Sequence, residues 1–515
     1  MIDNILNYKN TFGKHSIDLT AVATRDRKKY EMIETTGSNF AANGNTTLGI
    51  NGLHKATVQK VNMDNNQRSN IGYLGRASYS YDDRYFFTGS YRRDGASVFG
   101  VNQKWGDFFA FGGAWRLSSE KFMSSISYLD DLKLKLSWGK NGNQGLDPYG
   151  TLSTINNGAS GGVRYEFGGS DIIYGLNQKA LGNANLGWET TESWNTGFES
   201  AWLGSRLFVD LDLYFSKTTD QIFTRDIPVM TGFKNMKSSM GQVNNRGVEL
   251  TIRSVNIDTQ DWYWTTNLTF WLNRNKLIHL YGEDLDGDGR EDDDISNSRF
   301  IGKPLGAIYG YLQDGIVQET DVEYMKANGA TPGIPKYKDM DNDGVITSAD
   351  RIILGYSTPN FKLNMSNTIT YKNWDLYFML TGTFGGGGYY QKSNKGAYLT
   401  NGSGRFNTNG IYIPWWTPEN KSNEYPAATF NDDGGRFLGL QNRAFVRLQD
   451  VTLSYTFREP WVQKVNIQNL KVFFTAKNLF TITKWQGGDP EVGVTVSENT
   501  YPVLTSFSLG ANISF

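Results

Sequence analysis

Apolar and polar residues alternate along much of this chain, and the alternating segments are separated by turn residues. The clearest example is the segment from residue 507 to residue 515. Its odd-numbered residues are Phe, Leu, Ala, Ile and Phe, and the even-numbered residues between them are Ser, Gly, Asn and Ser. A period of two indicates a β-strand with one apolar and one polar face, whereas a helix has a period of 3.6 residues.

A second alternating segment carries charge on its polar face. In residues 207–215 the odd-numbered positions are Leu, Val or Phe, while Asp210 and Asp212 fall on the other face. Carboxylates that face inward are costly in the packed core of a sandwich and are well solvated in a water-filled lumen. The pattern therefore favours a membrane-spanning β-barrel over a soluble β-sandwich.

Aromatic residues flank the short turns between neighbouring strands. Tyr81 and Tyr85 lie on either side of one turn, and Tyr371 and Trp374 on either side of another. Tyr and Trp in these places are typical of the aromatic girdle at a membrane interface. The alternative is that Tyr and Trp are simply common in strands.

Fourteen strand-like segments are predicted, and long polar stretches separate alternate pairs of them. The strands begin near His15, Ile71, Arg84, Asp107, Leu132, Trp188, Arg206, Val243, Trp262, Phe361, Trp374, Phe445, Leu470 and Thr505. The long stretches are 34–51, 141–181, 282–350 and 385–439. Short turns at one end and long loops at the other are typical of outer-membrane barrels, whereas a sandwich or propeller has more even spacing.

Composition excludes several other classes of protein. The 515 residues contain no uncharged apolar run long enough for a transmembrane helix, and 51 basic against 52 acidic residues give no global basic field for nucleic acid. With no cysteine and three histidines, a disulfide framework, a thiolate zinc site and a histidine metal centre are all disfavoured. The 57 Gly, 28 Tyr and 30 Phe suit a large β-sheet protein. The first sixteen residues lack the features of a secretory signal, so we expect the chain to be a fragment.

Several longer motifs carry a resemblance to a known family. They include YRRDGASVFG (91–100), LKLKLSWGKNGN (132–143), NANLGWETTESWNTGFE (183–199), GQVNNRGVEL (241–250), AKNLFTIT (476–483) with GGDPEV after it, and the terminal SLGANISF. In order and spacing they resemble the barrel of the SusC-like (SusC/RagA) TonB-dependent outer-membrane transporters. The resemblance covers essentially the whole chain.

This resemblance implies an antiparallel barrel of roughly 22 strands with a plug in its lumen. It also implies a segment that contacts TonB, a SusD-like surface lipoprotein as a lid, and import of oligosaccharides or peptides across the outer membrane of a Gram-negative bacterium of the Bacteroidota type. Residues 1–515 are then the C-terminal portion of the barrel, forming its wall and its substrate-contacting loops. We expect the plug, the signal peptide and about eight strands to lie outside them.

Two other functions stay open. A surface receptor captures a ligand on its loops without importing it, and a secreted all-β carbohydrate-active enzyme needs paired catalytic carboxylates. The sequence offers neither such a pair nor a nucleophile beside a base, so we predict that the protein is not an enzyme and has no organic cofactor. Membrane sedimentation and heat-modifiable gel migration would distinguish a barrel from the soluble enzyme.

The sharpest local motif is DMDNDGVITSAD, which has the spacing of a twelve-residue calcium loop. Its predicted ligands are Asp339, Asp341, Asp343, the carbonyl of Val345, Thr347 and Asp350. The alternative is a solvated acidic loop with ordinary turns. A second acidic run has Asp284, Asp286, Asp288 and Gly289 in the same opening register. Because its twelfth residue is Ile295, a solvated loop is the default there.

Aromatic residues in the long loops are candidates for contact with a sugar. They are Trp415, Trp416, Tyr389, Tyr390 and Tyr398. Flat apolar rings suit the C–H faces of sugars, but the same residues can instead pack the loops or contact a lid protein.

Overall fold

The computed structural model describes most of the chain. The described residues are 1–40, 46–157, 164–165, 173–233, 235–389, 414–430, 440–458, 460–464, 467–485, 489–491 and 503–515. They are dominated by one antiparallel sheet of fifteen strands.

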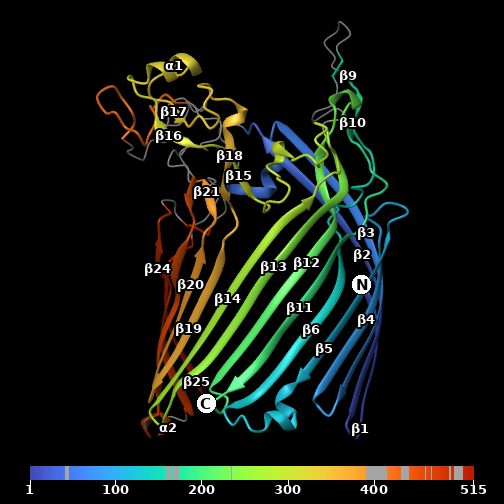
Figure 1. The fold of residues 1–515 in the computed structure, drawn as a ribbon, viewed down its shortest axis with the longest axis vertical. Helices are drawn as coiled ribbons and strands as arrows, with labels where there is room; N and C mark the ends of the chain where they lie inside the picture. Colours follow the sequence, from blue (N-terminus) through green and yellow to red (C-terminus); the bar gives the residue numbers. More distant parts are fainter. Residues whose placement is uncertain are drawn as a thin grey trace.

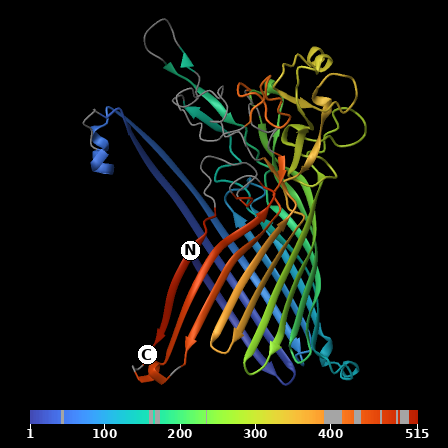
Figure 2. The ribbon, with the colours of Figure 1, turned by 90° about the vertical axis from the view of Figure 1, so that its left-hand side faces the viewer.

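Each strand of the large sheet pairs with the strands before and after it along the chain, which is an up-and-down topology. The strands are β1 (Ile2–Phe12), β2 (His15–Ser38), β3 (Val58–Tyr81), β4 (Tyr85–Ala96), β5 (Trp105–Arg116), β6 (Leu129–Asn143), β11 (Glu189–Trp202), β12 (Leu207–Asp226), β13 (Asn235–Asp258), β14 (Trp262–His279), β19 (Phe361–Tyr371), β20 (Trp374–Phe384), β23 (Phe445–Phe457), β24 (Asn469–Thr483) and β25 (Ser506–Ser514). The strands are tilted and form a curved wall (Figures 1 and 2). This confirms the predicted antiparallel barrel wall.

The fourteen predicted strands are all present, but the prediction missed β1 and misplaced the beginnings of β3 and β13. β3 begins at Val58 and pairs with β2 as far as Ser38, so the loop predicted from residue 34 was wrong in its first residues. Residues 58–70 are mostly polar on both faces, with Val58, Val61 and Met63 as the apolar exceptions, and β1 has asparagines on its otherwise apolar face. Neither segment alternates clearly between apolar and polar residues, so the two-residue period does not reveal it.

The two ends of the wall differ in the length of their connections, with short turns at one end and long loops at the other, as predicted. At the lower end in Figure 1, two residues join β1 to β2 and two join β19 to β20. This short-turn end also holds η2 (Leu117–Ser119), η3 (Lys121–Met123) and α2 (Pro460–Lys464). The long-loop end carries η1 (Thr46–Lys55), β7 (Thr154–Asn157), β8 (Arg164–Tyr165), β9 (Ile173–Tyr174), β10 (Leu176–Ala180), η4 (Val229–Thr231), η5 (Ile295–Asn297), β15 (Ala307–Tyr311), β16 (Gln313–Ile316), α1 (Val322–Asn328), β17 (Pro335–Tyr337), η6 (Ser348–Asp350), β18 (Arg351–Tyr356), β21 (Gly387–Tyr389) and β22 (Leu440–Asn442). In the described part of the chain, the helices are all too short or too polar to span a bilayer.

Apolar side chains cover the outward face of the wall. Phe87, Leu136 and Leu509 are 57%, 54% and 78% exposed, and large apolar residues of most other strands are exposed with them. A continuous apolar surface of this kind is rare in a soluble monomer. At the short-turn end, the rings of Tyr81 and Tyr85 stack with centroids 6.5 Å apart, and Tyr85 stacks on Trp115 at 6.3 Å. An apolar band with aromatic rings at its margin matches the surface of a membrane barrel.

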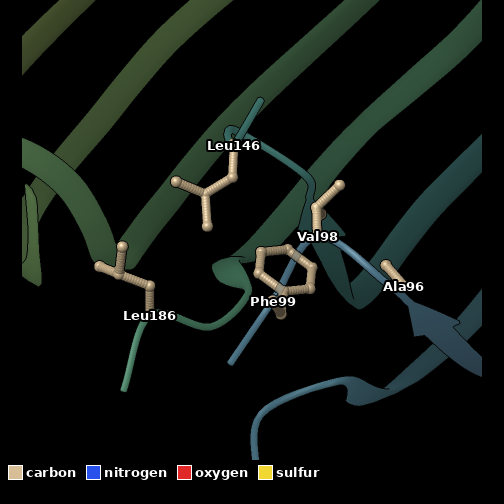
Figure 3. Packing of buried hydrophobic residues seen from close by; sticks show 5 residues of the cluster. All are labelled: Ala96, Val98, Phe99, Leu146 and Leu186. Carbon is tan, nitrogen blue, oxygen red and sulfur yellow. The ribbon is translucent and has the colours of Figure 1, made fainter. Parts of the chain in front are cut away.

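At the long-loop end, a small apolar core ties three loops to the wall (Figure 3). Its buried members are Ala96, Val98, Phe99, Leu146 and Leu186. They come from the end of YRRDGASVFG, from the segment after β6 and from NANLGW. The amide of Gly100 donates to the carbonyl of Leu186 at 3.0 Å. Two of the motifs that carried the family resemblance therefore contact each other in the fold.

Candidate functional site: the lumen face and the long-loop end

Charged residues on the inward face of the wall form an ion-pair network. The Nζ atom of Lys135 on β6 lies 2.9 Å from Asp210 and 3.1 Å from Asp212 on β12, and 3.3 Å from Glu199 on β11. The register brings them together, because Lys135 pairs with Gly197, which pairs with Asp212. The two aspartates predicted to face a lumen therefore do so, and three carboxylates surround one ammonium. This part of the lumen face is polar and acidic.

A buried arginine at the long-loop end was not predicted. Arg447 on β23 donates from Nη2 to Asp489 and from Nη1 to Glu491, both at 2.7 Å, and from Nε to Thr481 at 3.0 Å. Arg447 and Asp489 are 5% and 8% exposed. Asp489 also accepts from the amide of Val503 at 3.1 Å. The GGDPEV motif thus supplies the carboxylates that fix the loop after β24 to the wall.

The loop domain between β14 and β19 packs around one of the candidate aromatic residues. Trp416 is 8% exposed, and its Nε1 donates to Gln318 at 2.9 Å. A Cβ on Gly333 would lie 2.6 Å from the indole ring, so the backbone passes directly beside it. Trp416 is a core residue of this domain, and its indole ring is not accessible to a ligand in this structure.

The structure describes the other aromatic candidates only in part. Trp415 is half-buried, its carbonyl accepts from Asn420 at 2.6 Å, and its Nε1 is buried without a hydrogen-bond partner among the described residues. Tyr389 ends β21, and Tyr390 and Tyr398 lie outside the described residues. The structure therefore places Trp415 and Trp416 in loop packing, and the sugar-contact prediction for the other three rings falls outside what the structure describes.

The predicted calcium loop brings three of its carboxylates together. Oxygens of Asp339, Asp341 and Asp343 all lie within 4.8 Å of one another. Asp339 accepts from the amides of Asn342 at 2.6 Å and Gly344 at 2.7 Å, and Gly344 has a φ of 86°. Some loss of solvation, together with the neighbouring carboxylates of Asp343 and Asp350, raises the pKa of Asp341 above its usual range. The opening of the loop therefore gathers negative charge on one side.

Asp350 has a different role in this structure. Its side chain is fully buried, and its two oxygens accept from the amides of Thr347 and Met340, each at 2.7 Å. These hydrogen bonds lower the pKa of the carboxyl group. Together with the Thr347 hydroxyl, which accepts from the amide of Ala349, Asp350 forms the capping box of η6. Asp350 therefore closes the loop by accepting hydrogen bonds from the loop's own backbone amides.

The second acidic run repeats this arrangement. Asp284 accepts from the amides of Gly287 and Gly289, as Asp339 does in the first loop. Carboxylate oxygens of Asp284, Asp286 and Asp292 lie within 4.8 Å of one another. The predicted cluster included Asp288 and not Asp292, although Asp292 occupies the ninth place, where calcium loops often carry a ligand.

Fold and site together define the class of protein. A fifteen-strand up-and-down wall with an apolar outer face, a charged inner face and long loops at one end belongs to an outer-membrane β-barrel. The family described as "TonB dependent receptor-like, beta-barrel" matches residues 3–479, and the chain belongs to this family. The family consists of transporters and receptors, and it places the wall in the outer membrane of a Gram-negative bacterium.

Individual relatives match over nearly the entire chain. TonB-dependent receptor P3 of Formosa agariphila is 27% identical over 532 residues, covering 100% of this chain and 52% of the relative. TonB-dependent receptor SusC of Bacteroides thetaiotaomicron is 30% identical over 478 residues, covering 90% of this chain and 45% of the relative. The chain thus spans about half the length of these relatives.

Solved structures show the same fold. The structure of the RagAB peptide transporter superimposes with a TM-score of 0.77 at 23% identity, covering 100% of this chain and 55% of the matched chain. At 30% identity, the relative from Bacteroides agrees with the resemblance to the SusC-like (SusC/RagA) group within the family.

Proposed function

We propose that the whole protein imports a nutrient across the outer membrane in a TonB-dependent manner, and that residues 1–515 form the barrel wall and the loops that meet the substrate. The observation that carries this proposal is the polar inward face, with Lys135 held by Asp210, Asp212 and Glu199 along the lumen side of an otherwise lipid-covered sheet. Such a face suits the passage of a hydrated substrate.

The substrate class that we propose is an oligosaccharide or a peptide. The family resemblance supports both, and the RagAB structure is that of a peptide transporter. We propose a SusD-like surface lipoprotein over the long-loop end and TonB on the periplasmic side as partners. Relatives in Formosa and Bacteroides support a host of the Bacteroidota type.

Growth of the native bacterium tests the import proposal. We expect a strain without the gene to lose growth on one oligosaccharide or peptide supplied as the sole carbon or nitrogen source. The full-length gene should restore growth, and a strain without TonB should show the same defect. Normal growth of the deletion strain on every source, together with retained surface binding of a ligand, would instead favour the receptor alternative.

We also propose that the acidic loop at residues 339–350 binds Ca²⁺ in a structural role. Support comes from the convergence of Asp339, Asp341 and Asp343, whose mutual repulsion a divalent cation would relieve. Val345 and Thr347 would complete the oxygen ligands. Asp350 would keep the loop closed through its backbone hydrogen bonds. The loop at Asp284, Asp286 and Asp292 is a second, weaker place for the same ion, because Ile295 offers no closing carboxylate.

Calorimetry on the full-length protein in detergent, after removal of metal by a chelator, tests the calcium proposal. We expect a dissociation constant of about 10⁻⁴ to 10⁻³ M, the range of extracellular calcium modules. Asp341→Asn should abolish the heat from this loop, because it removes a charged ligand at the centre of the cluster. Glu323→Gln, which removes an exposed carboxylate from α1 in the same domain, is the matched control and should bind as the wild type does. Equal binding by both variants would contradict the proposal.

A further inference from the structure

The outward face of the wall contains an apolar groove of about 550 Å³ across β4, β5, β6 and β11. Its walls are Phe87, Phe111, Leu136, Trp138 and Trp194. Strand register places Gly89 beside Phe111 and Gly113 beside Phe87 on this same face, so these two glycines form its floor. The groove opens toward the lipid, since Phe87, Phe111 and Trp194 are 57%, 57% and 49% exposed.

The two floor glycines are not required by the fold. A Cβ on Gly89 would lie 3.5 Å from Phe111, and a Cβ on Gly113 would lie 3.9 Å or more from its neighbours, which are ordinary contacts. Gly247 on β13 is different, because a Cβ there would collide with the ring of Tyr214 and with a backbone carbonyl. At Gly89 and Gly113 the missing side chain therefore leaves the groove open without relieving any crowding.

One wall of the groove is held in position by a hydrogen bond. Trp138 donates from Nε1 to Glu192 at 2.8 Å, and the rings of Trp138 and Phe111 stack with centroids 5.9 Å apart. Glu192 pairs with Lys140 across the strands and lies one step nearer the long-loop end than Trp194. The apolar groove thus ends where polar side chains begin, as at the level of lipid headgroups.

Basic residues occupy the outward face beside the groove, either in the same register row as Trp138 and Trp194 or one row nearer the long loops. They are Lys140, Lys217, Arg246, Arg274 and Lys276. The strand register places these residues on the same face as the groove. Trp194 pairs with Phe215, Phe215 with Arg246, and Arg246 with Arg274. Lys140 and Lys217 both pair with Glu192. Among the described residues, no carboxylate lies within 4.0 Å of any of the five cations. Glu192 pairs with Lys140 and Lys217, and Asp107 and Asp220 line a pocket with Lys140. The positive charge is therefore concentrated on Lys217, Arg246 and Arg274.

Arg246 and Arg274 stand directly opposite each other, which is an unfavourable pairing of like charges unless an anion lies between them. Both side chains are exposed. Arg274 donates to the carbonyls of Asn273 at 2.9 Å and Asn360 at 2.5 Å, which orients it but leaves its charge unneutralised. Guanidinium groups in such an arrangement suit bidentate contact with phosphate oxygens.

We propose that this surface binds a phosphorylated lipid of the outer leaflet, with an acyl chain in the groove and its phosphate on Lys217, Arg246 and Arg274. The groove supplies apolar contact for a chain, and the cations supply the charge complementary to the headgroup. The inference rests on the outer-membrane location of the wall and goes beyond nutrient import. Lipid binding is measured on the purified protein, so its outcome is distinguishable from a failure of transport.

Native mass spectrometry of the full-length protein in mild detergent, titrated with bis-phosphorylated lipid A, tests the charged half of the site. We expect the triple variant Lys217→Gln, Arg246→Gln, Arg274→Gln to bind about 150-fold more weakly, which corresponds to about 1 kcal/mol for each of the three cations removed. The matched control is Arg76→Gln, Arg253→Gln, Lys362→Gln, which removes three cations from the opposite, inward face. The control should bind as the wild type does.

Leucine substitutions test the apolar half. Gly89→Leu with Gly113→Leu should fill the groove and weaken lipid A binding several-fold. Gly75→Leu should not, since a Cβ on this outward glycine of β3 meets nothing within 4 Å and Gly75 lies outside the groove. Heat-modifiable migration of each variant shows that it is folded.

Four outcomes would overturn the proposal. The first is that both triple variants bind lipid A equally well, and the second is that the wild type binds dephosphorylated and phosphorylated lipid A equally well. The third is that inorganic phosphate alone displaces the lipid completely. The fourth is that the triple variant at Lys217, Arg246 and Arg274 loses a co-purifying protein and still binds lipid. The last would identify the patch as a protein interface, and the third as a site for free phosphate.

Discussion

Replacing Arg447 with alanine is expected to destabilise the protein by about 3–5 kcal/mol, the cost of leaving a buried carboxylate without its partner. Asp489 is 8% exposed and would lose its 2.7 Å contact with the guanidinium. Its remaining partners are the amides of Glu491 at 2.9 Å and Val503 at 3.1 Å. Because those amides come from the loop after β24, we expect this loop to detach from the wall.

Denaturant unfolding of the full-length protein in detergent measures this effect, and proteolysis of the loop after β24 locates it. The matched control is Lys372→Ala, which breaks an exposed pair with Asp261 at 3.9 Å and should cost less than about 1 kcal/mol. The double variant Arg447→Met, Asp489→Leu should recover much of the loss, because no unpaired charge stays buried. A single Arg447→Ala variant as stable as the control would show that the pair does not hold the loop.

Gly100→Ala is expected to open the apolar core of Figure 3. A Cβ at this position would collide with the backbone carbonyl of Ala184, and no side chain can rotate away to make room. The chain would have to move at the Gly100–Leu186 hydrogen bond, beside Phe99 and Leu186, which are 2% and 0% exposed. Overpacking of this kind costs about 1–3 kcal/mol.

Limited proteolysis followed by mass spectrometry reads this change locally. If cleavage requires opening of the loop, a cost of about 1–3 kcal/mol accelerates cutting in residues 97–104 and 182–188 about 5- to 150-fold. Gly75→Ala is the control, because a Cβ there meets nothing within 4 Å. Cleavage rates that match between the two variants would mean that the loops are not held by this close approach.

Arg447 and Gly100 show why the sequence was informative about strands and less so about contacts between loops. The motifs GGDPEV and YRRDGASVFG carried the resemblance, but neither indicated its partner. Asp489 lies 42 residues after Arg447, and Leu186 lies 86 residues after Gly100. Such pairings depend on where whole strands bring the loops, and no local periodicity records that.

The acidic loops show the same division on a smaller scale. Spacing alone predicted that Asp339, Asp341 and Asp343 converge, because alternate residues of one tight turn face the same side. It did not predict that the backbone would occupy both oxygens of Asp350, or that Asp292 would join Asp284 and Asp286. Those positions depend on the path of the chain after the turn.

The alternation of residues, by itself, determined that this protein is an antiparallel barrel wall with Asp210 and Asp212 on its inner face, because the two-residue period of a strand sorts side chains between lipid and lumen locally. The tertiary structure decided the rest. It buried Trp416 against Gln318, 98 residues away, and it aligned Lys217, Arg246 and Arg274 from three strands into one outward patch. These placements follow from strand register and loop packing, which act between segments far apart in the chain.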